Sequence, residues 1–358
     1  MSDQTRELAF VFAGGNAVGA YHAGTYEALH DYGLRPDWVV GASMGAVTAA
    51  IIAGNAPADR VAKLRTFWDE ATQKTGPDPT GLLKPRQVYN GLHALMTLAL
   101  GRPNIFGHRL PGLWSVLPWV PNDVALFDNK PLLRTLNRLV DFERLNRGET
   151  RLTVGCVDIE TGEEVYFDTA REEIRPEHIL ASTAILPAFP PVEIDGRVLC
   201  DAGFTNNLPL DPVFAAEPKR DLLCIASDLF SLRAPRPASL DAVLERANDL
   251  IFASPPRRAI AGLMREYALR ERLDPTGPAV TLLHLVYHAG ADELAAKSFD
   301  FSPSSIRDRW AAGGRDATRG LELLAPGGSD KGRFRYLSLP DDLVAPKAAA
   351  PQAASAVR

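Results

Sequence analysis

The chain of 358 residues contains 46% hydrophobic, 23% charged and 8% aromatic residues, an ordinary globular composition that excludes a chain disordered throughout. Its 39 Lys and Arg residues against 44 Asp and Glu residues give a net charge of −5, so no overall positive field favours nucleic acid as a partner. Cys156, Cys200 and Cys224 are few and far apart. They exclude a disulfide framework and are expected to be buried thiols in a reducing compartment.

The first fifty residues alternate between predicted strands and helices. A strand at 8–13 leads into a glycine-rich turn at 14–19 and a helix to about residue 30, and a strand at 38–40 leads into a helix from Met44. This alternation is typical of a parallel α/β sheet. The polar start is unlike a signal peptide, and no apolar run reaches the roughly 20 residues that a membrane span needs, so we expect a cytoplasmic protein.

Further along the chain, apolar residues at helical spacing predict helices, and turns at 160–162 and 195–196 predict two hairpins. The predicted helices are 58–72, one from Pro131, 256–273 and one from Pro303 capped by Ser302, and the predicted strands are 151–158, 163–168, 192–194, 197–200, 221–227 and 279–287.

Composition predicts three regions. Periodicity is lost in a proline-rich segment, 76–128, which we expect to be a loop-rich insert. We expect a main domain over 1–290 that includes this insert, and a C-terminal helical extension over 291–345. The Ala/Pro-rich tail, 346–358, has nothing to bury and is expected to be disordered.

The pentapeptide Gly41-Ala42-Ser43-Met44-Gly45 stands between a predicted strand and a helix rich in small residues. A nucleophilic serine needs this context, because a tight strand-to-helix turn exposes its hydroxyl and flanking glycines let the backbone turn without Cβ clashes. The helix N-terminus also favours an alkoxide. The motif makes Ser43 a candidate nucleophile at an elbow formed by Gly41 and Gly45, with a plain glycine-rich turn as the alternative.

The glycine-rich loop Gly14-Gly15-Asn16-Ala17-Val18-Gly19 closes the first strand and opens a helix. Several backbone N–H groups of such a loop point to one spot, which suits a phosphate or a tetrahedral oxyanion. A dinucleotide site needs a glycine where Asn16 stands and an acidic residue after the next strand, which is absent. An oxyanion hole formed by Gly14, Gly15, Asn16 and Gly19 is therefore favoured, with a purely structural turn as the alternative.

Asp201 follows the predicted strand 197–200 and precedes Ala202-Gly203. A carboxylate placed beside Ser43 accepts its proton as a general base if burial raises its pKa toward working pH. An isolated Asp more often makes an Asx turn or caps a helix. The prediction for Asp201 therefore depends on its combination with the other two motifs.

These three motifs, in this order, resemble the patatin-like phospholipase family. That family combines a glycine-rich loop on the first strand, a G-x-S-x-G nucleophile about two dozen residues later, and a D-G/A-G aspartate after a long interval. The segment 181–191 resembles the family's A-S-x-A…P-x-x-F-P stretch. The similarity spans roughly 8–210, and 298–313 is similar to the C-terminal extension of one bacterial branch of the family.

The resemblance implies a three-layer α/β/α sandwich with a mostly parallel sheet, and a cofactor-free serine acyl hydrolase that cleaves lipid esters through an acyl-enzyme. By position, it makes Ser43 the nucleophile and Asp201 its sole side-chain partner in a Ser-Asp dyad. Asn16 replaces the loop's third glycine and Val18 its usual basic residue. These departures leave open a drifted member that binds lipid or a protein partner without efficient hydrolysis.

A histidine-containing triad is the competing catalytic hypothesis. An α/β-hydrolase also has G-x-S-x-G, followed by an acid and a histidine, and His284 and His288 lie late in the chain. Both belong to an apolar run where a hydrogen-bonded core histidine is commoner, and His22 is expected to pack against the sheet, so we favour the dyad. No His spacing or carboxylate cluster matches a metal-binding pattern, and no metal is expected.

The most apolar irregular segment is 110–120, which carries Trp114 and Trp119. A buried loop covering one face of the sheet is the favoured interpretation. The alternative is a rim of the Ser43 cleft that makes peripheral membrane contact, because Trp favours the interfacial zone. The arginines between 257 and 272 are explained by a solvated helix face, with attraction to anionic membranes as the alternative.

Overall fold

The computed structural model describes residues 6–72, 86–290, 292–324 and 332–339. Within them, one nine-stranded sheet has the order β11-β10-β9-β1-β2-β5-β8-β7, with β6 also paired to β5. The strands of this sheet are β1 Arg6–Phe12, β2 Trp38–Ala42, β5 Arg151–Asp158, β6 Glu164–Asp168, β7 Val192–Ile194, β8 Arg197–Asp201, β9 Asp221–Asp228, β10 Val280–Val286 and β11 Phe334–Ser338. A separate ribbon pairs β3, Gly107–His108, with β4, Phe127–Asp128.

The sheet is mostly parallel. Strands β11, β10, β9, β1, β2 and β5 run in one direction, whereas β6 and β8 are antiparallel to β5. β2 is buried along its whole length and β9 is buried except at its first residue, as expected where helices cover both faces. The carboxyl ends of six strands therefore meet at one edge.

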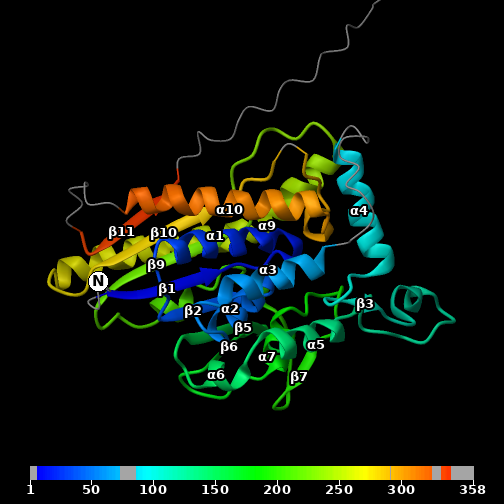
Figure 1. Cartoon of the computed structure of the whole chain (residues 1–358), viewed down its shortest axis with the longest axis horizontal. Helices are drawn as coiled ribbons and strands as arrows, with labels where there is room; N and C mark the ends of the chain where they lie inside the picture. Colours follow the sequence, from blue (N-terminus) through cyan, green and yellow to red (C-terminus); the bar gives the residue numbers. More distant parts are fainter. Residues whose placement is uncertain (1–5, 73–85, 291, 325–331, 340–358) are drawn as a thin grey trace, which may run out of the picture.

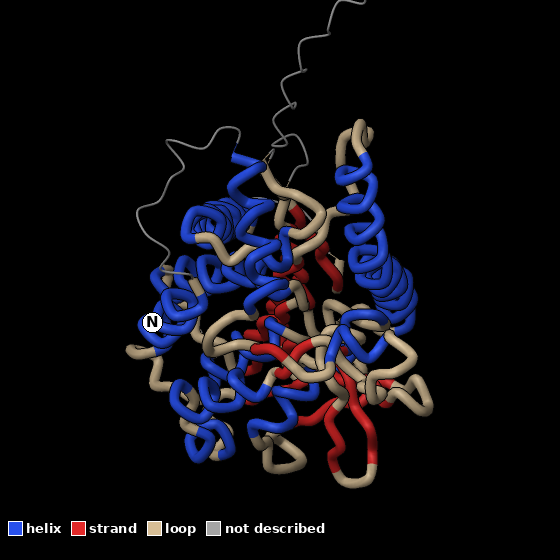
Figure 2. The backbone as a smooth tube through the Cα atoms, turned by 90° about the vertical axis from the view of Figure 1, so that its right-hand side faces the viewer, coloured by secondary structure: helices blue, strands red, loops and turns tan. Residues whose placement is uncertain are grey.

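Helices cover both faces of this sheet (Figures 1 and 2). Phe10 and Phe12 of β1 belong to one cluster of buried apolar side chains, and Ala9 and Val11 belong to another, because successive side chains of a strand point to opposite faces. The first cluster contains side chains of α1 Ala20–Asp31, α2 Met44–Ala53, α3 Arg60–Ala71, α5 Lys130–Leu139, α6 Phe142–Asn146, α7 Pro176–Ser182 and α10 Pro303–Leu323, and the second those of α8 Asp211–Phe214 and α9 Leu240–Leu273. The expected three-layer α/β/α sandwich is confirmed.

The segment expected as a C-terminal helical extension contributes to this sandwich. Helix α10, capped by Ser302 as expected, lies against α1 at two glycines. A Cβ on Gly24 would lie 1.8 Å from the Trp310 carbonyl oxygen, and one on Gly313 would lie 2.0 Å from that of Tyr21. Strand β11, which the sequence did not predict, extends the sheet beside β10.

The short helices α6, α7 and α8 were not predicted, and two long helices also differ from the sequence prediction. The prediction of an irregular insert was wrong for α4, Arg86–Leu100, which buries Tyr89, His93 and Thr97 on one side. Helix α9 begins at Leu240 rather than near Pro256 and continues through that proline, although proline usually marks a helix start. Its N-cap Ser239 accepts a hydrogen bond from the Ala242 N–H at 3.1 Å.

Three further expectations concern the cysteines, membrane-spanning helices and the terminal and insert segments. The three cysteines are buried free thiols. Among the described helices, none combines the length and the apolar character that crossing a bilayer requires. The tail 346–358 and the first part of the insert, 76–85, lie outside the described residues.

Candidate active site

Ser43 occupies a strained turn between β2 and α2. Its backbone has φ 56° and ψ −127°, a conformation that non-glycine residues rarely adopt and that tends to occur at functional sites. The flanking glycines are required by close contact: a Cβ on Gly41 would lie 2.4 Å from the Gly45 carbonyl carbon, and one on Gly45 would lie 2.2 Å from the Phe12 carbonyl oxygen. The local sequence thus forms a tight strand-to-helix elbow with Ser43 at its apex.

A residue that sequence reasoning missed supports this turn. The Ser43 N–H donates to Ser182 Oγ at 2.9 Å, and the Ser182 hydroxyl donates to the Gly155 carbonyl at 2.6 Å. Ser182 is buried at the end of α7. The one signal in the sequence was that Ser182 belongs to the segment 181–191, which resembles a stretch of the family. The sequence did not indicate what this segment does.

The glycine-rich loop lies directly against the serine. A Cβ on Gly14 would lie 2.8 Å from Ser43 Cβ and 2.6 Å from Asn207 Oδ1. The Gly14 N–H is already occupied, because it donates to the Asn207 carbonyl at 3.1 Å, and Asn207 Nδ2 donates back to the Gly14 carbonyl at 3.2 Å. Asn207 is a second residue whose role the sequence did not reveal.

The rest of the loop forms η1, Asn16–Gly19. Asn16 has φ 49°, which Asn tolerates better than most residues. The N–H groups of Gly15 and Asn16 form no hydrogen bond within the described residues. Gly19 allows close packing, since a Cβ there would lie 2.6 Å from Met44 Cγ.

Asp201 ends β8 and is only 1% exposed. Its Oδ1 accepts a hydrogen bond from the Gly203 N–H at 2.7 Å, and its buried Oδ2 forms no hydrogen bond of good geometry within the described residues. Burial raises the pKa of Asp201 to about 7, against the opposing effects of the Ser43 side chain and the Gly203 amide. The structure therefore brings Asp201 and Ser43 together, although they lie far apart in the chain.

Both side chains line a cavity of about 470 Å³, together with Gly14, Gly15 and Asn16. Its walls are largely apolar and come from both faces of the sheet. The apolar lining residues include Leu98, Ile105, Leu132, Ile185, Phe189, Phe230, Leu244, Phe252 and Phe299. Lys297 also lines it, and its charge is paired with Asp249 at 2.8 Å. The cavity can hold a long apolar chain next to the Ser43 hydroxyl.

The family assignment follows from comparison with known proteins. A family model described as patatin-like phospholipase matches residues 10–214, more than half of the chain. The chain belongs to the patatin-like phospholipase family. A second model, described as patatin phospholipase, matches residues 265–324, which include the whole of α10.

Relatives of this patatin-like chain include uncharacterized NTE family proteins of Mycobacterium bovis and Mycobacterium tuberculosis. Each is 27% identical over 221 residues, which cover 62% of this chain and 30% of the mycobacterial protein. Similar solved structures include VipD from Legionella pneumophila, with a TM-score of 0.41, 14% identity, and coverage of 89% of this chain and 67% of that one. Human GIVD cytosolic phospholipase A2 has a TM-score of 0.34, 12% identity, and coverage of 63% and 43%.

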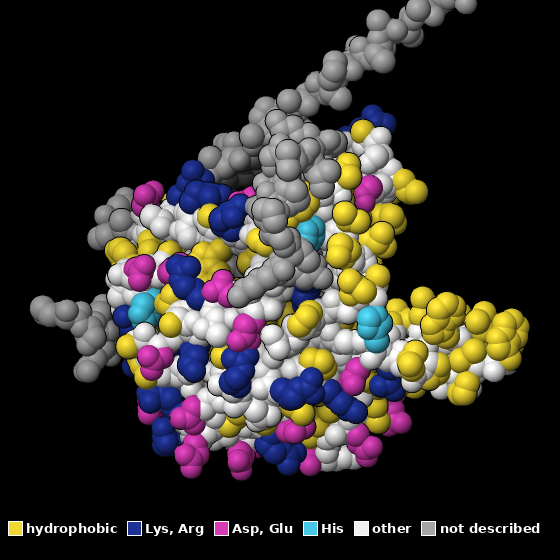
Figure 3. Space-filling view, turned by 45° about the vertical axis from the view of Figure 1, so that its right-hand side comes forward, with side chains coloured by type: hydrophobic (Ala, Val, Ile, Leu, Met, Phe, Trp, Pro, Cys, Tyr) yellow, Lys and Arg dark blue, Asp and Glu magenta, His cyan; other side chains and the backbone are white. Residues whose placement is uncertain are grey.

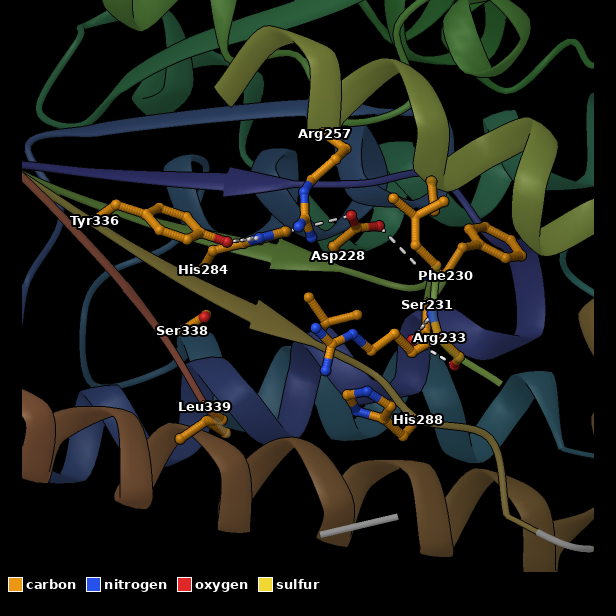
Figure 4. A pocket seen from close by; sticks show the side chains of 13 residues that line it. Asp228, Phe230, Ser231, Arg233, Arg257, His284, His288, Tyr336, Ser338 and Leu339 are labelled. Atoms are coloured by element: carbon orange, nitrogen blue, oxygen red, sulfur yellow. Dashed lines mark hydrogen bonds and ion pairs between the residues drawn. The ribbon is translucent and has the colours of Figure 1, made fainter. Parts of the chain in front are cut away.

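The histidines considered for a triad lie elsewhere in this patatin-like fold. His284 Nε2 is 3.3 Å from Asp228 Oδ2 and its Nδ1 is 3.1 Å from the Tyr336 hydroxyl (Figure 4). His284 and His288 line a different cavity from the one that contains Ser43. His22 is buried between Ser227 Oγ and the Ala13 carbonyl, both at 2.8 Å, and burial lowers its pKa to about 4. His22 is thus a core residue, as expected.

No group of three or more His, Cys, Asp or Glu side chains is arranged to hold a metal ion within the described part of the chain.

The apolar segment 110–120 of the proline-rich insert, which we call the apolar lobe, is exposed. Trp114 is 62% and Trp119 is 78% exposed, so the favoured interpretation of a buried loop was wrong. Figure 3 shows hydrophobic side chains gathered on a projection at the right of the molecule. Asp123 holds the base of the lobe, where its carboxylate accepts hydrogen bonds from Arg109 Nε at 2.8 Å and from the Gly112 N–H at 3.1 Å. Leu113 and Val116 are also exposed, at 62% and 75%, so the lobe projects into solvent.

Proposed function

We propose that this chain is a serine acyl hydrolase that cleaves lipid acyl esters, with Ser43 as nucleophile and Asp201 as general base. The observation that carries the proposal is the burial of Asp201 beside Ser43, with its pKa raised to about 7. A base of this pKa is partly ionised at neutral pH and strong enough to accept a proton from an attacking hydroxyl. Its Oδ2, which has no good hydrogen bond among the described residues, is the atom that we assign to that proton.

In the proposed mechanism, Asp201 takes the Ser43 proton as Ser43 Oγ attacks the acyl carbonyl. The carbonyl oxygen becomes the oxyanion, and the N–H groups of Gly15 and Asn16, which have no hydrogen-bond partner among the described residues, donate to it. The proton passes from Asp201 to the leaving alkoxide, which departs as the alcohol. Water then attacks the acyl-enzyme with Asp201 again as base, which releases the acid and restores Ser43.

The remaining loop glycines have a different role in this proposal. The Gly14 N–H is occupied by Asn207, and Gly19 is in contact range of Met44. Both contribute the space that lets the loop approach the elbow, whereas Gly15 and Asn16 contribute donors. Because the donors are backbone groups, the side chain of Asn16 does not remove them.

The cavity supports a lipid acyl group as the substrate. A wall of leucine, isoleucine and phenylalanine side chains around Ser43 favours apolar chains, since each buried CH₂ contributes about 0.8 kcal/mol. The proposed substrate is therefore an ester with a long acyl chain. The proposed reaction uses no cofactor.

Peripheral membrane contact through Trp114 and Trp119 is part of the proposal. Helix α4 also carries an exposed apolar stripe: Val88, Leu92 and Leu95 are 58%, 48% and 62% exposed. Leu98, further along that helix, lines the cavity. Large exposed apolar surfaces mark membrane or protein interaction sites, and this one adjoins the proposed substrate cavity.

A fluorophosphonate probe tests the hydrolase proposal, because it reacts covalently with an activated serine. We expect labelling of the intact chain and none in Ser43→Ala, with p-nitrophenyl butyrate hydrolysis lost in parallel. The second candidate is a protein that binds lipid without efficient hydrolysis, which Asn16 and Val18 favour as departures from the family pattern. Absence of labelling in a folded, lipid-binding intact chain would support that candidate instead.

A further inference from the structure

A second, smaller cavity lies at the carboxyl ends of β9, β10 and β11. It has a volume of about 70 Å³ and shares only Phe230 with the cavity that contains Ser43. One water needs about 10–15 Å³, so this space admits a small polyatomic group. Ligands of open α/β sheets commonly bind outside the carboxyl ends of the strands. The proposed hydrolase mechanism does not use this site.

Cationic and polar groups reach this cavity from three directions. Figure 4 shows Arg257 extending from α9 toward Asp228, Arg233 extending inward from the segment after β9, and His288 on the opposite side. The hydroxyl-bearing residues Ser231 and Ser338 also line it. Two guanidinium groups are therefore placed around one small space.

One carboxylate, Asp228, shares the cavity, but other groups hold it. Its Oδ2 lies 3.3 Å from His284 Nε2, and its Oδ1 accepts the Phe230 N–H at 3.3 Å. The Tyr336 hydroxyl engages the other ring nitrogen of His284 at 3.1 Å. Each oxygen of the Asp228 carboxylate therefore has a partner other than the two arginines.

We propose that this cavity binds a phosphoryl group between Arg233 and Arg257. Guanidinium forks match the geometry of phosphate oxygens. Donors that approach from three sides suit a tetrahedral group with several oxygens better than a planar carboxylate. The same chemistry occurs in free phosphate and in a phospholipid headgroup, and the experiment separates these two sources.

The first arm measures binding of inorganic phosphate to the full chain by isothermal titration calorimetry. Arg257→Gln is expected to weaken binding about tenfold, since a hydrogen bond to a charged group contributes roughly 1.5–3 kcal/mol. Arg258→Gln is the matched control, because it removes the same charge from the next position of α9, and Arg258 does not line the cavity. Both arginines are exposed, so both variants are expected to fold.

The second arm measures retention on phosphatidylcholine vesicles with and without 10% phosphatidic acid. Retention that depends on phosphatidic acid, and that Arg257→Gln but not Arg258→Gln weakens, identifies a headgroup. Phosphate binding without such retention identifies a free phosphate. The proposal is overturned if neither arm detects binding, or if both variants weaken it equally. Neither readout requires ester hydrolysis, so the result is independent of the proposed catalytic function.

Discussion

The elbow at Ser43 and the apolar lobe differ in how tightly their surroundings constrain them. Around the elbow, a Cβ on Gly14, Gly41 or Gly45 would approach neighbouring atoms to 2.6 Å or less. In the lobe, Leu110 and Trp119 are 84% and 78% exposed. Chemistry requires groups held in fixed geometry, whereas contact with a deformable lipid surface does not. Changes at the elbow should therefore affect turnover, and changes in the lobe should affect only lipid partition.

The largest expected effect is a loss of activity without a loss of stability when Asp201 is replaced. Asp201→Asn removes the proposed base and should lower p-nitrophenyl butyrate hydrolysis by about 10⁴-fold, as loss of a catalytic acid–base partner typically does. The thermal unfolding midpoint at pH 7 should not fall, because the substitution removes a buried ionisable group. Asp195→Asn, in the exposed turn between β7 and β8, is the control and should retain activity. Full activity in Asp201→Asn would remove Asp201 from the mechanism.

The next largest effect is expected from a substitution in the glycine-rich loop that lies against the elbow. Gly14→Ala places a Cβ against Ser43 and Asn207, which should displace the Gly15 and Asn16 amides and lower kcat by about 10²–10³-fold. Gly290→Ala is the matched control, since a Cβ there meets no atom within 4 Å. Circular dichroism would establish that both variants are folded. Unchanged kcat in folded Gly14→Ala would show that loop placement is not critical.

Substitutions in the apolar lobe should change lipid partition and leave turnover nearly unchanged. Trp114→Ala combined with Trp119→Ala should reduce vesicle partition by tenfold or more, because full burial of one large apolar side chain contributes roughly 1.5–3 kcal/mol. Hydrolysis of the soluble ester should stay within about twofold. Leu269→Ala combined with Leu273→Ala removes side chains that are 59% and 87% exposed at the C-terminal end of α9 and should not change partition. Equal losses in both double variants would argue against a specific lobe contact.

The last expected effect is the pH dependence that Asp201 imposes. Since its pKa is raised to about 7, soluble-ester hydrolysis should rise about tenfold per pH unit below this value and level off above it. Stability should change in the other direction. Between about pH 4 and 7 the unfolded carboxyl is ionised and the folded one is protonated, so unfolding becomes easier as pH rises.

The Asp201→Asn variant isolates this stability effect. The full difference between the two pKa values corresponds to about 4 kcal/mol. The variant should lack this component of the pH dependence of stability, as measured by urea unfolding from pH 4 to pH 8. An identical pH dependence in both chains would mean that Asp201 has an ordinary pKa.

Sequence reasoning succeeded where local sterics dominate. The glycines around Ser43 predicted a strand-to-helix turn, and the structure has that turn at a positive φ. The turns at 160–162 and 195–196 predicted two hairpins, which the structure contains. Sequence reasoning failed where tertiary contacts determine whether a segment is helical. In α4, the buried residues Tyr89, His93 and Thr97 became recognisable as one side of a helix only with their packing partners.

The sequence by itself determined the alternation of strands and helices over the first fifty residues and the tight turn at Ser43, because glycine sterics and apolar spacing act over a few residues. Only the tertiary structure decided that Asp201 lies beside Ser43, that Ser182 and Asn207 hold the elbow and the loop, and that Trp114 and Trp119 are exposed. These outcomes depend on which strands pair and which surfaces are covered. The raised pKa of Asp201 has the same origin, since desolvation is a property of the packed environment rather than of the residue.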